Sequence, residues 1–219
     1  MRDELSNYRK VDMYLDYEVI ASGSKGNAVR INDVLVDCGI PYNKLKEHLY
    51  DVRYLLITHI HSDHVRKGTL NQIKKQFPNI TIIGNYQVHE VFGVDLIINA
   101  GYELEIEDYI FNAFECEHDV VTYGYYWETE DEETVFYCTD TSNLENVGKE
   151  LEFDYIFLES NHDFYKLEAT REQDFKNGYH PYFSGKRHLS TQQAKEFYLL
   201  HRKNREVPFI ELHKSERFY

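Results

Sequence analysis

One segment constrains the fold of this chain more than any other part of its sequence. In "THIHSDH", three histidines and an aspartate lie within six positions, directly after the apolar run "YLLI". A tight loop after a buried strand can point His59 and His61 to one side, and Asp63 and His64 to the other. Neutral imidazoles and carboxylates are the ligands that zinc and similar divalent ions take in proteins. The segment therefore predicts a metal site at the end of a buried strand.

One loop cannot complete the ligand shells of two metal ions, so further ligands are expected elsewhere. Three candidates end or leave apolar, strand-like runs in the same manner: His118 in "FECEHDV", Asp140 in "FYCTDTS" and His213 in "FIELHKS". Strands that end at one edge of packed sheets deliver their last side chains into a common cleft. We therefore expect these three residues to meet the histidine-rich loop.

The order of the predicted elements indicates a layered α/β domain. Helical spacing is clearest in "GTLNQIKKQF" and "TQQAKEFYLLHRKN", whereas "RYLLIT", "FDYIFLES" and "PFIEL" are typical of strands. The middle of the chain is β-rich, with "DYIFNAFEC", "YGYYWET" and "TVFYCTD" as consecutive strands. Strands and helices interleave, and the helices suffice to cover both faces of packed sheets. At 219 residues the chain is expected to form one domain over residues 1–219.

Composition and charge narrow the classes of partner and compartment. The net charge is −14, whereas proteins that grip long nucleic acids usually carry a basic stripe. A small phosphorylated ligand therefore fits better than a polymer. No apolar run reaches the length of a membrane span, and the N-terminus lacks an apolar signal core. Cys38, Cys116 and Cys138 are typical of reduced core thiols, so a cytoplasmic protein is expected.

These motifs resemble those of a known superfamily. "THIHSDH" resembles the HxHxDH signature of the metallo-β-lactamase superfamily. "SGSKGNA", "LVDCG" and "CTDTSN" resemble segments of its YycJ/WalJ-like branch. "KRHLST" and the final "HKSERFY" resemble the Gly-His-Ser-Thr and His-x-Ser-x-Arg-Tyr segments of ribonuclease Z. The resemblance implies an αββα sandwich and a hydrolase with two divalent metal ions, Zn²⁺ or alternatively Mn²⁺.

The same resemblance implies a ligand set of two groups with one shared bridge. One metal ion would be held by His59, His61 and His118, the other by Asp63, His64 and His213, and both by Asp140. Two divalent ions can share a water, lower its pKa and clamp the oxygens of a phosphodiester.

Three residues receive catalytic roles from the resemblance. Asp63 would orient the attacking water, and His188, positioned by Glu159, would protonate the leaving oxygen. His188 has two alternative interpretations, a phosphate-binding group or a surface-loop histidine. The chain also departs from the ribonuclease Z pattern, because Arg187 replaces a glycine and Lys214 an apolar residue.

The substrate predicted from the resemblance is a small nucleotide. The chain lacks the long arm with which ribonuclease Z grips transfer RNA, and in this it resembles the viral anti-Pycsar phosphodiesterases. These imply hydrolysis of 3′,5′-cyclic mononucleotides to linear 5′-monophosphates in the host cytoplasm, by a homodimer. The alternatives are a single-strand DNA or RNA exonuclease, a ribonuclease Z-like nuclease, and a non-catalytic metal-binding scaffold. Four tyrosines could stack on a nucleobase: Tyr123, Tyr125, Tyr179 and Tyr182.

Overall fold

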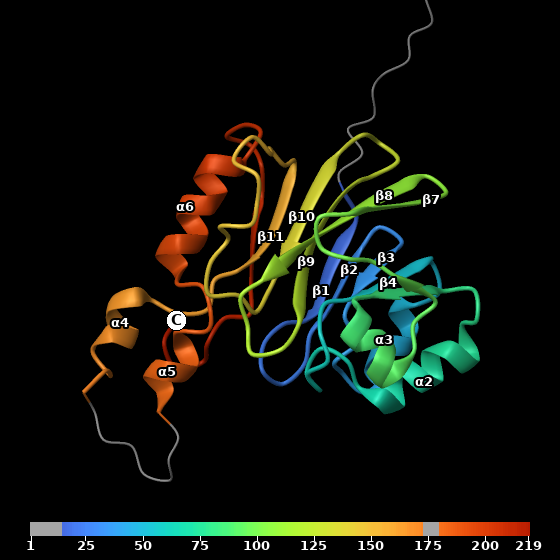
Figure 1. Ribbon diagram of the computed structural model, residues 1–219, viewed down its shortest axis with the longest axis horizontal. Helices are drawn as coiled ribbons and strands as arrows, with labels where there is room; N and C mark the ends of the chain where they lie inside the picture. The colour runs from blue at the N-terminus through green and yellow to red at the C-terminus, as the bar shows by residue number, and fades with distance from the viewer. Residues whose placement is uncertain (1–14, 173–179) are drawn as a thin grey trace, which may run out of the picture.

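Two six-stranded sheets lie face to face, and helices cover the outer face of each sheet (Figure 1). The structure is a computed structural model, and it describes residues 15–172 and 180–219. The layers therefore follow the order helix, sheet, sheet, helix. This arrangement confirms the αββα sandwich.

The first sheet has the strand order β1-β2-β3-β4-β5-β6. Its strands are β1 (Tyr17–Ala21), β2 (Ala28–Ile31), β3 (Val34–Val36), β4 (Tyr54–Ile57), β5 (Thr81–Gly84) and β6 (Leu96–Ile97). β1 to β3 form an antiparallel meander, whereas β3 to β6 pair in parallel. β3 and β4 are buried along their whole length, as their unbroken apolar runs predict.

The second sheet has the strand order β12-β11-β10-β9-β8-β7. Its strands are β7 (Glu103–Ile106), β8 (Tyr109–Cys116), β9 (Thr122–Glu128), β10 (Thr134–Cys138), β11 (Tyr155–Glu159) and β12 (Phe209–Leu212). β7 to β10 are antiparallel neighbours, and β10, β11 and β12 pair in parallel. β8, β10, β11 and β12 consequently all end at the same edge of the sheet.

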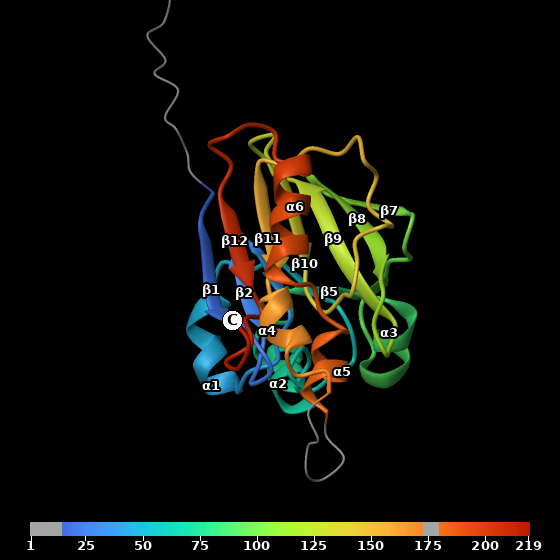
Figure 2. The same cartoon turned by 90° about the vertical axis from the view of Figure 1, so that its left-hand side faces the viewer.

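The helices form two groups, one on each sheet (Figures 1 and 2). The first group is α1 (Tyr42–Leu45), the 3₁₀ helix η1 (Lys46–His48), α2 (Lys67–Gln76) and α3 (Tyr86–Phe92). The second group is α4 (Phe164–Glu168), α5 (Pro181–Gly185) and α6 (Thr191–His201). α6 begins with a capping box in which Ser190 and Gln193 satisfy each other's backbone amides.

Separate apolar clusters hold the layers together. The cluster between the sheets joins residues of both, including Leu56 of β4 and Trp127 of β9. A second cluster packs the first sheet against its helices, and a third packs Phe197 of α6 against the second sheet. Burial of these side chains supplies the main driving force for the fold. It also fixes the strand ends from which the candidate site is built.

Two further findings concern the cysteines and the helices. All three cysteines are buried and free, as predicted. Across residues 15–172 and 180–219, no helix combines the length and the apolar character needed to cross a membrane.

Candidate metal centre

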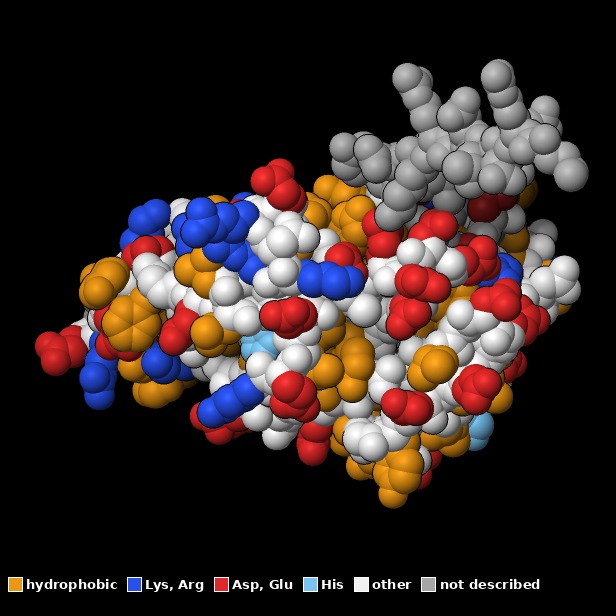
Figure 3. Space-filling model, turned by 90° about the horizontal axis from the view of Figure 1, so that it is seen from above, with side chains coloured by type: hydrophobic (Ala, Val, Ile, Leu, Met, Phe, Trp, Pro, Cys, Tyr) orange, Lys and Arg blue, Asp and Glu red, His pale blue; other side chains and the backbone are white. Residues whose placement is uncertain are grey.

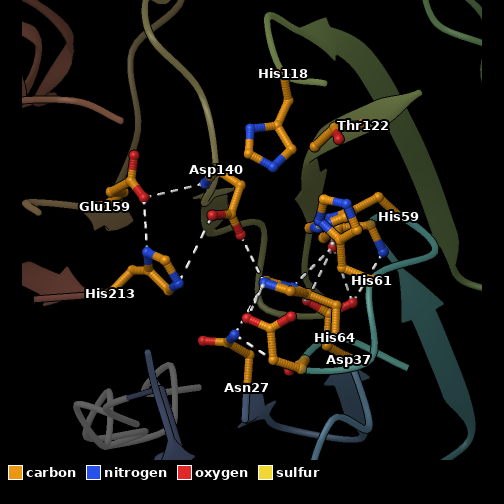
Figure 4. Close-up of polar contacts among 12 residues, drawn as sticks. Asn27, Asp37, His59, His61, His64, His118, Thr122, Asp140, Glu159 and His213 are labelled. Atoms are coloured by element: carbon orange, nitrogen blue, oxygen red, sulfur yellow. Dashed lines mark hydrogen bonds and ion pairs between the residues drawn. The ribbon is translucent and has the colours of Figure 1, made fainter. Parts of the chain in front are cut away.

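The predicted site residues meet at one edge of the sandwich, where strands of both sheets end (Figure 4). His59 comes two positions after β4 in the first sheet. In the second sheet, His118 follows β8, Asp140 follows β10, Glu159 is the last residue of β11 and His213 follows β12. Parallel strand directions thus bring together side chains that lie far apart in the sequence.

The first predicted ligand group forms a compact set of imidazoles. Potential ligand atoms of His59, His61 and His118 all lie within 4.8 Å of one another. Nε2 of His59 lies 3.1 Å from Nδ1 of His61. His59 is fully buried, and this burial holds the pKa of its imidazole well below the usual range. A neutral imidazole is the form that binds a metal ion.

The second predicted group lies beside the first. Potential ligand atoms of Asp63, His64 and His213 also lie within 4.8 Å of one another. Asp140 lies between the groups. A carboxylate oxygen of Asp140 lies within 4.8 Å of ligand atoms of His59 and His64, and one also lies within 4.8 Å of a ligand atom of His213. Its Oδ2 is 2.6 Å from Nε2 of His64, and its Oδ1 is 3.6 Å from Nε2 of His213. The seven predicted side chains therefore converge, with Asp140 in the position expected of a bridge.

Backbone conformation aims three of the side chains into the site. Asp37, Asp140 and His213 have φ values of 64°, 57° and 51°, each directly or almost directly after a strand. The left-handed region is unfavourable for residues with a side chain, and such strain concentrates at functional sites. Hydrogen bonds hold the last of these turns, because the His213 amide donates to Ser22 Oγ and Asn161 Nδ2 donates to the His213 carbonyl.

Asp37 is a site residue that sequence analysis did not single out. It is fully buried at the end of β3, and its Oδ2 lies 2.6 Å from Nδ1 of His64. Its Oδ1 accepts hydrogen bonds from the backbone amide and hydroxyl of Thr58. A carboxylate behind a histidine fixes the ring and leaves the opposite nitrogen to face a metal ion. Its place in "LVDCG", directly after an apolar strand-like run, was the available signal.

Backbone hydrogen bonds from neighbouring segments hold the loop that carries Asp63. The backbone amide of Asn27 donates to the Asp63 carbonyl at 2.7 Å. The backbone amide of Cys38 donates to the His64 carbonyl at 2.8 Å. A Cβ atom at Gly39 would lie 1.7 Å from the Asp63 carbonyl oxygen. Only glycine permits this approach.

Glu159 and His188 form the pair that the resemblance implied. His188 Nδ1 lies 2.8 Å from Glu159 Oε2 and 3.2 Å from Asp140 Oδ1. Burial lowers the pKa of His188, but Glu159 and Asp140 outweigh it and raise the pKa to about 9. Burial likewise opposes ionisation of Glu159, but His188 and His213 lower its pKa to about 2. With its side chain only 14% exposed, His188 is not a surface-loop histidine.

The donor set fits a divalent cation. Three buried carboxylates, Asp37, Asp140 and Glu159, lie against imidazoles, so the site concentrates negative charge that a cation can neutralise. Within the described part of the chain, the buried His118 Nδ1 and His213 Nε2 have no hydrogen-bond partner. Unpaired nitrogens in a histidine–carboxylate cluster are suited to metal coordination.

Two hollows flank the cluster. One, of about 340 Å³, is lined by His188 and His213 together with the Ser22–Lys25 loop and the C-terminal segment from Lys214 to Phe218. The other, of about 630 Å³, is lined by His118 and the loops around it. Neither Tyr123 nor Tyr125 lines either hollow. Tyr123 and Tyr125 are buried in the core between the sheets, and Tyr179 lies outside the described residues.

Tyr182 is not available to a nucleobase either. It is only 9% exposed and packs against Leu167 of α4 and Phe218 in a small apolar cluster. Tyr123, Tyr125 and Tyr182 therefore serve core packing.

Solved structures with this architecture include a tRNase Z and a diphosphatase. Human short-form tRNase Z is 18% identical, with a TM-score of 0.66 over 92% of this chain and 93% of its own. A diphosphatase of the PhnP family is 15% identical, with a TM-score of 0.61 over 92% and 87%. YhfI from Bacillus subtilis is 17% identical, with a TM-score of 0.65 over 91% and 86%. At these identities the similarity establishes the fold.

Sequence comparison supplies the family. No curated protein matches the chain. The profile of the metallo-beta-lactamase superfamily matches residues 26–150, a segment that includes the whole "THIHSDH" motif, His118 and Asp140. Because this match spans more than half of the sequence, the chain belongs to the metallo-β-lactamase superfamily.

Proposed function

We propose that this protein is a two-metal phosphodiesterase that hydrolyses 3′,5′-cyclic mononucleotides to linear nucleoside 5′-monophosphates. The observation that carries the proposal is the convergence of two ligand groups around Asp140. The similar tRNase Z and PhnP-family diphosphatase favour a phosphate-containing substrate. The expected homodimer, the cytoplasmic location and a role in viral counter-defence belong to the same proposal.

The metal ions would be held by the residues of the two groups. Of these, His59, His61 and His118 would bind one ion, Asp63, His64 and His213 the other, and Asp140 both. Bound divalent ions supply neutralisation of phosphate oxygens and a lower pKa for a nearby water. The identity of the metal, Zn²⁺ or Mn²⁺, is part of the proposal.

The side chains of the site supply orientation and a proton. Asp63, 29% exposed, accepts a hydrogen bond from the attacking water and directs it at phosphorus. As the water oxygen bonds to phosphorus, the bond to the ribose 3′ oxygen breaks. His188 has a pKa of about 9, so it carries a proton at neutral pH and donates it to that leaving oxygen. Glu159 holds the ring and stabilises its charge.

The dimensions of the site favour a small substrate. A hollow of about 340 Å³ adjoins His188 and His213, near the lower limit of small-molecule pockets, which measure roughly 300–1,000 Å³. One nucleotide is the expected occupant. The net charge of the chain, −14, disfavours binding of a long polyanion.

A second candidate function is a single-strand nuclease of the ribonuclease Z type. The similarity to human tRNase Z over nearly the whole of both chains favours it. A non-catalytic metal-binding scaffold is disfavoured, because every ligand position carries a suitable side chain and all seven converge.

A substrate panel tests the proposal. The zinc- or manganese-loaded protein is incubated with bis(p-nitrophenyl) phosphate, 3′,5′-cyclic mononucleotides, cyclic dinucleotides and labelled single-stranded oligonucleotides. We expect cyclic mononucleotides to be the fastest natural substrates, and His59→Ala or Asp63→Ala to abolish hydrolysis. His48→Ala is the matched control, because His48 lies outside the cluster and pairs with Glu18. Rapid trimming of oligonucleotides with inert cyclic mononucleotides would favour the nuclease instead.

A further inference from the structure

Arg187 connects the two sides of the site. It precedes His188 in the segment between α5 and α6, and its Nη1 donates a hydrogen bond to Oδ2 of Asp119 in the loop after β8. The other carboxylate oxygen of Asp119 lies 3.1 Å from Nε2 of His118 and 3.5 Å from Nε2 of His61. The Asp119 carboxylate therefore links the Arg187 guanidinium to the first ligand group.

The Arg187–Asp119 ion pair lies beside an acidic hollow. The hollow beside His118 is lined by no lysine or arginine among the described residues. Its acidic lining residues are Glu115, Glu117, Asp119 and Glu145. A substrate phosphate at the candidate metal centre, which this hollow adjoins through His118, therefore meets repulsion from carboxylates, and this repulsion weakens binding. Arg187 offsets part of this repulsion, because its partner Asp119 contacts His118 and His61.

The ion pair can be exchanged for a ligand at small cost. The side chains of Arg187 and Asp119 are 49% and 42% exposed. Ion pairs this exposed contribute little to stability, because water screens both charges. A guanidinium has five N–H donors in a planar fork that matches a phosphate group. Among the described residues, Asp119 is the hydrogen-bond partner found for this fork, and it engages one nitrogen.

We propose that Arg187 is a substrate-binding residue that donates hydrogen bonds to a non-bridging oxygen of the substrate phosphate. Asp119 holds the guanidinium at the mouth of the site until substrate arrives. This inference rests on the proposed phosphodiesterase function and deepens it. It also explains what the chain gains from an arginine at the position where the ribonuclease Z pattern has glycine.

The test compares Arg187→Met with Lys186→Met. Lys186 is the adjacent residue, is 48% exposed and carries the same charge, but its Nζ lies 3.8 Å from Glu168 and above the ring of Tyr182. We expect Arg187→Met to lower kcat/KM for bis(p-nitrophenyl) phosphate roughly 10- to 100-fold, and to weaken competitive inhibition by inorganic phosphate. Lys186→Met should leave both unchanged, and Arg187→Lys should be intermediate because it keeps the charge without the fork.

Two readouts separate this inference from the proposed function. If the wild-type protein does not hydrolyse phosphodiesters, calorimetric titration of the metal-loaded protein with inorganic phosphate still tests Arg187. Weaker phosphate binding in Arg187→Met, with an unchanged unfolding midpoint and metal content, supports the inference. Equal phosphate binding and equal kcat/KM in the Arg187→Met and Lys186→Met variants would overturn it. A matching loss of metal content in Arg187→Met would also overturn it, by indicating a structural role.

Discussion

At the scale of single residues, the site depends on carboxylates that support histidines. Asp37 lies behind His64, and Glu159 lies behind both His188 and His213. The sequence predicted Glu159 only through a resemblance and did not predict Asp37. Asp37 reaches His64 only through a left-handed turn after β3 and the pairing of β3 with β4. Neither feature is visible in a hydrophobic pattern. Ligand residues were easier to predict, because their types and spacing are chemically distinctive.

Replacement of Asp37 tests this supporting role. We expect Asp37→Asn to lower zinc affinity roughly 10- to 100-fold, since His64 loses the charged partner that orients its ring. Competition with a chromogenic chelator measures the change. Asp33→Asn is the control, because Asp33 lies just before β3 and pairs with Arg53 and Tyr109, away from the site. Equal zinc affinity in the two variants would contradict the role assigned to Asp37.

At the scale of elements, long apolar runs were predictable and short or polar elements were not. The expected strands and helices that carry the ligands are all present. β6, β7, α4 and α5 were missed. β6 has only two residues, and β7 alternates polar and apolar residues over only four positions, too short a run to stand out as a strand. α4 and α5 have five residues each, too few to show helical periodicity.

The contact between Gly39 and the histidine-rich loop offers a test at this scale. In Gly39→Ala the new methyl group would collide with the Asp63 carbonyl, which no side-chain rotation relieves. We expect a loss of roughly 1–3 kcal/mol in the free energy of unfolding, together with reduced phosphodiester hydrolysis. Urea denaturation and the bis(p-nitrophenyl) phosphate assay measure the two effects.

Gly68→Ala is the matched control for that substitution. Gly68 lies in the first turn of α2, and no atom lies within 4 Å of a Cβ built there. Alanine favours helix, so stability should stay unchanged or rise by up to about 1 kcal/mol. If Gly39→Ala behaved like Gly68→Ala, the close packing of the Asp63 loop would be refuted.

At the scale of the whole molecule, an acidic surface lies at the strand ends opposite the candidate metal centre. Figure 3 shows acidic side chains gathered over the end of the molecule that carries β7 and β8. There Arg53 pairs with Asp33, Glu107 and Glu130. The net charge predicted a small ligand, but it could not show where the basic side chains lie. Their arrangement around the site depends on how segments distant in the sequence meet.

The central claim is that seven side chains from both sheets cage a pair of divalent cations. Crystals grown with zinc, and measured at the zinc absorption edge, test it most directly. We expect two anomalous peaks per chain, roughly 3.5–4 Å apart, with Asp140 in contact with both. A single peak, peaks away from this edge, or His118, Asp140 and His213 remote from His59 would contradict it.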